Sequence, residues 1–141
     1  MQEDQQKNIK EKMMDFDHVA FQVSDMDSSI NFYTQKLGFK LNFRSINEEE
    51  QEEYAFLEYG NASLELIQNL KEEYKKPEIR KPYCPHFCLE IENMKQSVET
   101  LGKNNISIIR GPLEVKDEET WVYFSDPDNN VLEYIQWYRK K

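Results

Sequence analysis

The sequence predicts an α+β fold in which two tandem βαβββ modules form a curved mixed sheet. Three observations lead to this prediction. Short β-branched and aromatic runs that alternate with polar residues indicate strands, and two amphipathic runs that end at a glycine indicate helices. The order of these elements also restarts after residue 82. A length of 141 residues favours a single domain with its own hydrophobic core.

The composition excludes several classes of protein. Hydrophobic residues make up 38% and charged residues 32% of the chain, as is usual for a globular domain. The net charge of −9 disfavours binding to a phosphate backbone, so no nucleic-acid partner is expected. No apolar run approaches the roughly 18 residues of a membrane span, and the N-terminus lacks a signal-peptide core, so no membrane partner is expected and the cytoplasm is the expected location. Two cysteines, Cys84 and Cys88, are too far apart on one strand for a relaxed disulfide.

The first module is expected over residues 15–69, after a flexible polar extension over residues 1–14. A helix is expected to begin at Ser24 or Asp25, because either side chain can cap it, and to end at Gly38. Its apolar face carries Met26, Ile30, Tyr33 and Leu37. The strands are expected over Phe16–Val23, Phe39–Ile46, Tyr54–Tyr59 and Ala62–Gln68.

The second module is expected over residues 83–138, after a linker over residues 70–82 that contains two prolines. Asn93 is expected to cap a helix that ends near Gly102. The turn Asp126–Asn130 combines a proline with residues that tolerate left-handed backbone, so it is expected to direct the last strand. The strands are expected over Cys84–Ile91, Ile106–Arg110, Trp121–Ser125 and Val131–Trp137.

A constant offset of 68 residues relates the two modules. It superposes the only two histidines, His18 and His86, and it also superposes Glu65 on Glu133. A repeated supersecondary unit favours pseudo-two-fold packing, which can bring equivalent residues together near the axis. Further pairs at this offset are Val23–Ile91, Met26–Met94, Ile30–Val98, Phe56–Phe124, Leu64–Leu132, Ile67–Ile135 and Gln68–Gln136.

Two imidazoles and two carboxylates around one point suit a divalent transition metal, with Zn, Ni, Co, Mn and Fe all compatible. The predicted metal ligands are therefore His18, Glu65, His86 and Glu133. Each residue taken alone also has a structural explanation. A strand histidine can be a satisfied structural residue, and Glu133 could pair with a lysine across the sheet. The coincidence of all four positions favours the metal site.

Several motifs resemble the vicinal oxygen chelate superfamily, the glyoxalase, bleomycin-resistance and dioxygenase group. The resemblance extends from Asp15 to Trp137 and implies a glyoxalase-like fold. The order His, Glu, His, Glu is similar to that of bacterial-type glyoxalase I (lactoylglutathione lyase). The motifs are His18, Asn31-Phe32-Tyr33, Leu37-Gly38-Phe39, Leu64-Glu65-Leu66, Pro85-His86-Phe87, Asp126-Pro127-Asp128-Asn129-Asn130 and Leu132-Glu133.

The resemblance implies a metal-dependent enzyme that converts the hemithioacetal of a 2-oxoaldehyde and a thiol into a 2-hydroxyacyl thioester through a metal-stabilised enediolate. Glu133 would be the base and Glu65 its pseudo-symmetric counterpart. Two alternatives stay open: a metal-dependent epimerase of the methylmalonyl-CoA type, and a non-catalytic drug- or metabolite-binding protein. A homodimer is implied as well, and the four ligands could come from one chain or from two.

The resemblance also implies which residues bind the substrate. Asn69 and Lys116 are similar to glutathione-contacting positions of the family, whereas Gln22 stands where the family usually has arginine. Without that cation a glutathione carboxylate lacks its obvious partner, so another thiol is an alternative. The expected pocket walls are Ala20, Ile67, Cys88, Ile135 and Trp137.

Overall fold

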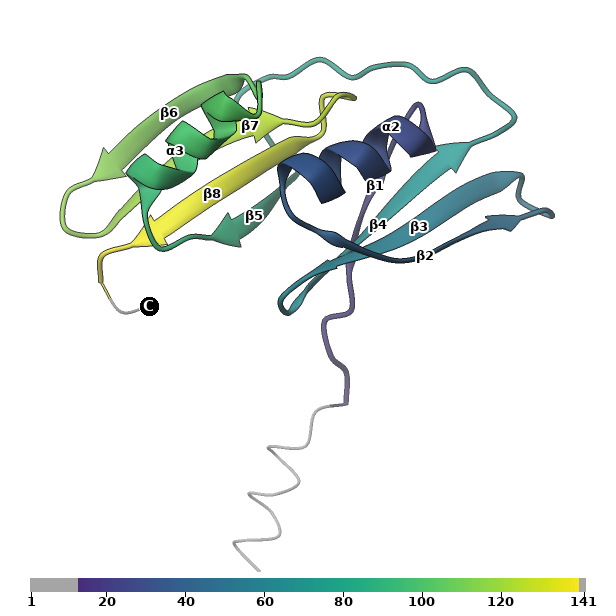
Figure 1. The fold of residues 1–141 in the computed structure, drawn as a ribbon, viewed down its shortest axis with the longest axis horizontal. Helices are drawn as coiled ribbons and strands as arrows, with labels where there is room; N and C mark the ends of the chain where they lie inside the picture. The colour runs from purple at the N-terminus through teal and green to yellow at the C-terminus, as the bar shows by residue number, and fades with distance from the viewer. Residues whose placement is uncertain (1–12, 140–141) are drawn as a thin grey trace, which may run out of the picture.

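A computed structural model describes residues 13–139, so all but the last two residues of the predicted N-terminal extension lie outside the described range. The chain forms two four-stranded mixed sheets that lie side by side, each with one helical segment across one face (Figure 1). The α+β class and the repeated order of elements are therefore confirmed. The eight strands are divided between two sheets, and no strand of one sheet pairs with a strand of the other among the described residues.

The first sheet has the strand order β1-β4-β3-β2, with β1 parallel to β4 and the other neighbours antiparallel. Its helical segment begins as the α-helix α2 and continues as the π-helix η1. Gly38 follows with a φ of +84°, which agrees with the predicted left-handed helix stop. The elements are β1 (Val19–Gln22), α2 (Met26–Asn31), η1 (Phe32–Lys36), β2 (Lys40–Asn47), β3 (Glu52–Tyr59) and β4 (Ala62–Asn69).

The second sheet repeats this arrangement in the order β5-β8-β7-β6, with β5 parallel to β8. The linker runs between the two sheets as an extended segment from the end of β4 to the start of β5 (Figure 1). Among residues 13–139 no helix is long and apolar enough to cross a membrane. The elements are β5 (His86–Glu90), α3 (Met94–Lys103), β6 (Ile108–Val115), β7 (Glu119–Ser125) and β8 (Val131–Trp137).

One hydrogen bond at the start of each helix shows how closely the modules repeat. The side-chain oxygen of Gln68 accepts from the Met26 amide at 2.8 Å, and that of Gln136 accepts from the Met94 amide at 2.8 Å. Both glutamines thus satisfy a backbone donor that the helix itself leaves unpaired. The Asn93 side chain also accepts from the Gln96 amide at 3.0 Å, as the predicted cap requires. The offset of 68 therefore relates equivalent structural positions in these elements.

The hydrophobic core lies between each sheet and its helix. Successive strand residues point to opposite faces, so burying every second residue leaves the residues between them on the other face. Glu65 lies between Leu64 and Leu66, both 0% exposed, and Glu133 follows Leu132, also 0% exposed. The helices therefore cover the apolar face of each sheet, and the histidine- and glutamate-bearing face is open.

The predicted equivalence of Phe56 and Phe124 is wrong. Phe56 pairs in register with Glu65, whereas the residue paired with Glu133 is Tyr123. Phe124 instead points into the core and is fully buried. The chain from Tyr123 to its partner Glu133 is one residue longer than that from Phe56 to its partner Glu65, and a one-residue shift moves every side chain of a strand to the other face. In this strand the correct offset is 67.

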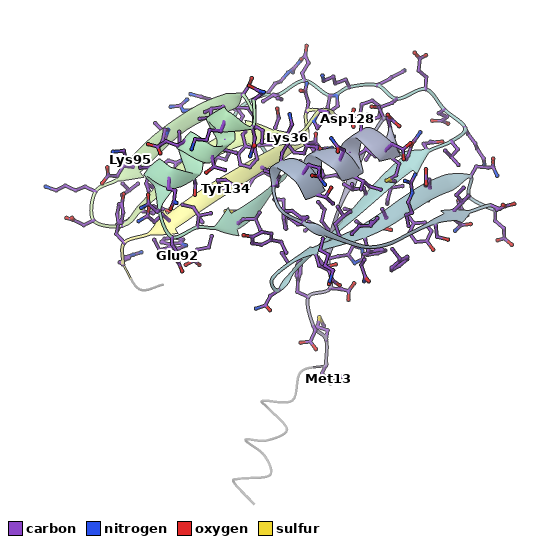
Figure 2. The ribbon with its side chains drawn as sticks, in the orientation of Figure 1. Met13, Lys36, Glu92, Lys95, Asp128 and Tyr134 are labelled. Atoms are coloured by element: carbon purple, nitrogen blue, oxygen red, sulfur yellow. The ribbon has the colours of Figure 1, made fainter. Side chains whose placement is uncertain are left out.

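The turn over residues 126–130 also joins the two modules, which the sequence did not indicate. The Asp128 carboxylate, 4% exposed, accepts from the Ser24 amide at 2.9 Å and the Ser24 hydroxyl at 2.6 Å. The Tyr33 hydroxyl donates to Asp126 at 2.8 Å. Figure 2 shows Asp128 close to the α2 segment, and its partner Ser24 lies 104 residues away along the chain. The turn therefore fixes the start of β8 to the first module.

Candidate active site

The first histidine–glutamate pair lies on the open face of the first sheet. His18 directly precedes β1 and Glu65 is in β4, which is parallel to β1. His18 Nε2 lies 3.2 Å from Glu65 Oε1, and the two side chains are 31% and 17% exposed. On its other side the ring donates from Nδ1 to Asp17 Oδ2 at 2.7 Å. This hydrogen bond to Asp17 raises the pKa of His18, partial burial lowers it, and the Glu65 carboxylate raises it further.

The second pair repeats this geometry on the second sheet. His86 is the first residue of β5 and Glu133 is the third residue of β8. His86 Nε2 lies 3.0 Å from Glu133 Oε1, and the Glu133 side chain is 12% exposed. Here Nδ1 donates to the backbone carbonyl of Tyr83 at 2.9 Å. The two rings are therefore oriented alike, although one is held by a carboxylate and the other by a carbonyl.

The donors and acceptors of these pairs suit a cation. Because Nδ1 of each ring donates to an oxygen, a neutral ring presents its unprotonated Nε2 to the glutamate. A nitrogen lone pair and a carboxylate oxygen repel each other at about 3 Å unless a proton or a metal ion lies between them. Histidines that bind metals through Nε2 usually donate from Nδ1 to a carboxylate or carbonyl, and both His18 and His86 do so. The residues therefore fit a divalent metal, two ligands from each module.

The four predicted ligands do not meet at one point within the chain. Among residues 13–139 there is no group of three or more His, Cys, Asp and Glu side chains that could hold a metal ion. The reason is that each pair belongs to its own sheet and that, within residues 13–139, the two sheets share no strand pairing. One chain thus carries two half-sites, each with one imidazole and one carboxylate.

An aromatic ring lies beside each histidine, and the sequence reasoning missed both. The Phe56 ring centroid is 5.0 Å from that of His18, and the Tyr123 centroid is 5.3 Å from that of His86, both edge to face. Both residues lie one strand away from the glutamate of their module. Alternation along β3 and β7 predicts these positions once the offset of 67 is known. These rings make one side of each half-site apolar.

The predicted substrate-binding residues of the first module lie together. Ala20, Gln22, Ile67 and Asn69 line a pocket of about 310 Å³ on the face that carries Glu65. Its other lining residues are Phe21 and Glu52. Asn69 Oδ1 accepts from the backbone amides of Lys71 at 2.8 Å and Glu72 at 3.1 Å, which fixes its side chain at the end of β4.

Of the predicted residues of the second module, Cys88, Ile135 and Trp137 lie along its open face. Cys88 pairs in register with Glu133, and Ile135 and Trp137 follow Glu133 at alternate positions of β8. Lys116 is exposed in the turn between β6 and β7. Glu119, the first residue of β7 after this turn, pairs in register with Trp137. Cys84 and Cys88 are both exposed, and within residues 13–139 neither forms a disulfide bond.

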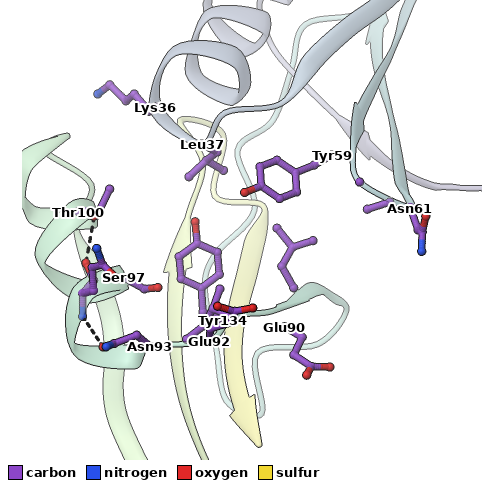
Figure 3. A pocket seen from close by; sticks show the side chains of 15 residues that line it. Lys36, Leu37, Tyr59, Asn61, Glu90, Glu92, Asn93, Ser97, Thr100 and Tyr134 are labelled. Carbon is purple, nitrogen blue, oxygen red and sulfur yellow. Dashed lines mark hydrogen bonds between the residues drawn. The ribbon is translucent and has the colours of Figure 1, made fainter.

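The largest of the described pockets is separate from the histidines. It has a volume of about 1010 Å³ and lies between the modules, where Tyr59 and Tyr134 project into it (Figure 3). Burial raises the pKa of Tyr134 to about 12, and the neighbouring Tyr59 adds to the shift. None of the four predicted metal ligands lines this cavity. Its size therefore does not mark it as the reaction site.

Comparison with known sequences places the chain among related proteins. A family model described as "Glyoxalase/Bleomycin resistance protein/Dioxygenase superfamily" matches residues 15–134. A lactoylglutathione lyase from Escherichia coli O157:H7 is 32% identical over 122 residues, which are 84% of this chain and 90% of that protein. A metallothiol transferase FosB from Staphylococcus epidermidis is 30% identical over 82% of this chain and 77% of that protein.

Other relatives are longer. A probable chloroplastic lactoylglutathione lyase from Arabidopsis thaliana is 32% identical over 92% of this chain, but the chain spans only 37% of that protein. Among solved structures, a glyoxalase family protein from Enterococcus faecalis superposes with a TM-score of 0.72 at 22% identity, covering 87% of this chain and 98% of that one. At this identity the superposition supports the fold alone.

Proposed function

Because the chain belongs to the Glyoxalase/Bleomycin resistance protein/Dioxygenase superfamily, we propose that it is a metal-dependent, glyoxalase I-like lyase. Its substrate would be the hemithioacetal of a 2-oxoaldehyde, such as methylglyoxal, and a thiol, and its product a 2-hydroxyacyl thioester. The observation that carries the proposal is the pair of equivalent half-sites, in which His18 faces Glu65 and His86 faces Glu133. The role would be detoxification of the 2-oxoaldehyde.

A homodimer would complete the site. The first half-site of one chain would face the second half-site of its partner, so that two histidines and two glutamates surround one ion. Exposed apolar side chains on the open face support this arrangement. Phe43, 47% exposed, stacks on Phe56 at a centroid distance of 5.3 Å, and all eight residues of the edge strand β2 are exposed. Exposed apolar surface beside a functional group is typical of an interface.

The ion would be held by Nε2 of His18 and His86 and by the carboxylates of Glu65 and Glu133. Zn, Ni, Co, Mn and Fe all suit two imidazoles and two carboxylates. When bound, a divalent metal supplies Lewis-acid stabilisation of the negative charge that develops on the two neighbouring substrate oxygens. Asp17 and the Tyr83 carbonyl would keep the two rings in the ligating orientation.

Glu133 would carry the proton. Its carboxylate would take the proton from the carbon that bears the sulfur and the hydroxyl group, and the electron pair of that C–H bond would move toward the neighbouring carbonyl. The same carboxylate would then return the proton to the neighbouring carbon, while the proton of the original hydroxyl passes to the former carbonyl oxygen, which leaves a thioester and a new hydroxyl group. Glu65 would face the opposite side of the substrate, since it is the equivalent residue of the other module. Phe56 and Tyr123 would keep water away from the intermediate.

An epimerase of the methylmalonyl-CoA type is the second candidate. The observation that favours it is the equivalence of the two glutamates, because two carboxylates on opposite faces can remove a proton from one side and return it on the other. A non-catalytic protein that binds a drug or metabolite would not require either carboxylate as a base.

Metal analysis followed by an isomerase assay tests the proposal. The purified protein should bind about one Zn, Ni or Co ion per chain and should convert the methylglyoxal adduct of glutathione or of another thiol into the thioester. Failure to bind any of these ions would refute the metalloenzyme. Bound metal without turnover of any hemithioacetal, but with exchange of an acidic C–H proton in an acyl-CoA, would support the epimerase.

A further inference from the structure

The pocket on the open face of the first module lies where the distal part of a bound thiol would reach. Gln22 pairs in register with Ile67, and Glu52 pairs with Asn69. Ile67 is two residues and Asn69 four residues beyond Glu65, which corresponds to about 7 and about 13 Å along the strand. The pocket of about 310 Å³ therefore begins next to the metal half-site and extends away from it.

The charge of this pocket is negative. Glu52 is its only ionisable lining residue within the described part of the chain, and neither lysine nor arginine is among those lining residues. The neighbouring carboxylate of Glu53 is paired with Arg44 at 2.7 Å, whereas Glu52 has no ion-pair partner within 4 Å among residues 13–139. A carboxylate ligand here would be repelled by Glu52, whereas a cation would be attracted.

The polar groups of the pocket suit an ammonium group attached to an amide-containing chain. An ammonium has three donors and no acceptor, and the Glu52 carboxylate and the Gln22 amide oxygen are acceptors. The Asn69 oxygen already accepts two backbone hydrogen bonds, so its NH₂ group is the part that can donate to a substrate carbonyl. Because Glu52 pairs in register with Asn69, an acceptor and a donor lie side by side at this end of the pocket, which suits an amide that is close to an ammonium group.

Nearby cations do not cancel this preference. Arg80 and Lys81 line a different pocket, of about 450 Å³, on the linker side of β1. The guanidinium of Arg80 is paired with Glu78 in the same pocket. Gln22 borders both pockets, so a substrate head with both charges would place its cation toward Glu52.

We propose that the pocket of Gln22, Glu52 and Asn69 binds an ammonium group of the thiol half of the substrate, with Glu52 as its counter-ion. The inference rests on the proposed function, because the thiol enters this pocket only if its sulfur is held near the metal. It identifies the substrate class as an adduct of an aminothiol with a free amine, instead of a thiol whose distal end is only anionic or neutral.

Matched substrates test this proposal. Two substrates are used, the methylglyoxal adducts of glutathione and of N-acetylglutathione, and only the first has a free ammonium group. Their kcat/KM values are measured with metal-saturated wild type and with metal-saturated Glu52→Gln. Acetylation should lower kcat/KM about ten-fold for the wild type, the value expected for one charge-assisted hydrogen bond. In Glu52→Gln the two adducts should react equally, because the counter-ion is gone. Glu99→Gln removes the same charge from an exposed position on α3, so the ratio of the two kcat/KM values should equal that of the wild type.

Binding without turnover separates the two proposals. The dissociation constants of S-methylglutathione and its N-acetyl derivative should differ about ten-fold for the wild type and should agree for Glu52→Gln. If the wild type shows this ten-fold difference in dissociation constants but turns over neither methylglyoxal adduct, the isomerase function is refuted and the ammonium site is supported. An equal effect of acetylation in wild type and Glu52→Gln would show that it is steric and would overturn the site, as would binding of neither compound by the wild type.

Discussion

Asp17 Oδ2 lies 2.7 Å from His18 Nδ1, so an acid next to the histidine in sequence fixes which ring nitrogen faces Glu65. The equivalent position of the second module, 68 residues later, is Pro85, which has no acceptor in its side chain. There the Tyr83 carbonyl at 2.9 Å takes over the same role. The two half-sites are therefore alike in geometry but differ in charge, because only the first has a carboxylate behind its imidazole.

Replacing Asp17 should weaken metal binding. The Asp17 carboxylate orients the His18 ring and makes it more basic. Because Asp17→Ala removes this acceptor, the metal affinity should fall about 10- to 100-fold. Competition with a chromophoric chelator measures the change. Asp17→Asn keeps an acceptor oxygen without the charge and should lie between alanine and wild type. Glu99→Gln, which changes the same charge on a distant helix, should bind metal as the wild type does. An unchanged affinity in Asp17→Ala would show that the hydrogen bond has no such role.

Glu133→Gln should abolish turnover while the fold is retained. The amide cannot accept a proton, so kcat for the hemithioacetal should fall by at least about 100-fold at saturating metal. Circular dichroism and the thermal midpoint should stay close to those of the wild type, since Glu133 is on the open face of β8. Glu65→Gln provides the comparison. A larger loss in Glu65→Gln than in Glu133→Gln would move the role of base to Glu65.

Mixing two inactive variants should restore activity if the site is shared between chains. His18→Ala and His86→Ala should each be inactive, because each removes a ligand from every site. In a mixed dimer, one site would lack both histidines and the other would be intact. Random reassociation should therefore give about a quarter of the wild-type specific activity. The measurement is turnover after joint unfolding and refolding. Absence of recovery, with mixed dimers detected by mass spectrometry, would contradict the shared site.

The hydrogen bonds between the modules should contribute to stability. Ser24 donates both its amide and its hydroxyl to the buried Asp128 carboxylate, whereas Ser28 donates its hydroxyl to the exposed Asp25. Ser24→Ala should lower the free energy of unfolding by about 1.5 kcal/mol, because the acceptor is charged and buried. Ser28→Ala should cost less than about 0.5 kcal/mol. Urea unfolding of both variants provides the measurement, and equal losses would contradict the assignment.

Alkaline pH should destabilise the protein through its buried tyrosines. Burial raises the pKa of Tyr33 well above the ordinary value of 10.0, and the neighbouring Asp126 raises it further. Above pH 10 the unfolded chain therefore loses a phenolic proton that the folded chain keeps. The free energy of unfolding should then fall with rising pH, by up to about 1.4 kcal/mol per pH unit for this group.

Urea unfolding between pH 9 and 11 tests this effect. Tyr33→Phe should be less stable at pH 7, where it loses the hydrogen bond to Asp126, but its stability should decline less steeply above pH 10. Tyr138→Phe removes an exposed phenol and should decline as the wild type does. The same slope in Tyr33→Phe and wild type would show that Tyr33 does not govern the alkaline loss.

Much of the fold could be predicted because its signals are local. Alternation in β4 and β8, glycine at the helix stop and asparagine at the helix cap each depend on a few neighbouring residues. The offset of 68 was visible because the two histidines and their glutamates recur in the same order. The same offset failed for β3 and β7, where one additional residue between the paired positions places Tyr123, not Phe124, on the open face. A single chain offers no local signal for such a shift.

The sequence by itself determined the two modules and the four side chains that could hold a metal, because residue types and their spacing carry that information. Only the tertiary structure decided that the four side chains form two separate pairs, that Asp17 and the Tyr83 carbonyl orient the rings, and that Asp128 joins the modules. The physical reason is distance along the chain. The contact between Ser24 and Asp128 spans 104 residues, and such contacts depend on how the sheets pack rather than on any pattern within a strand or helix.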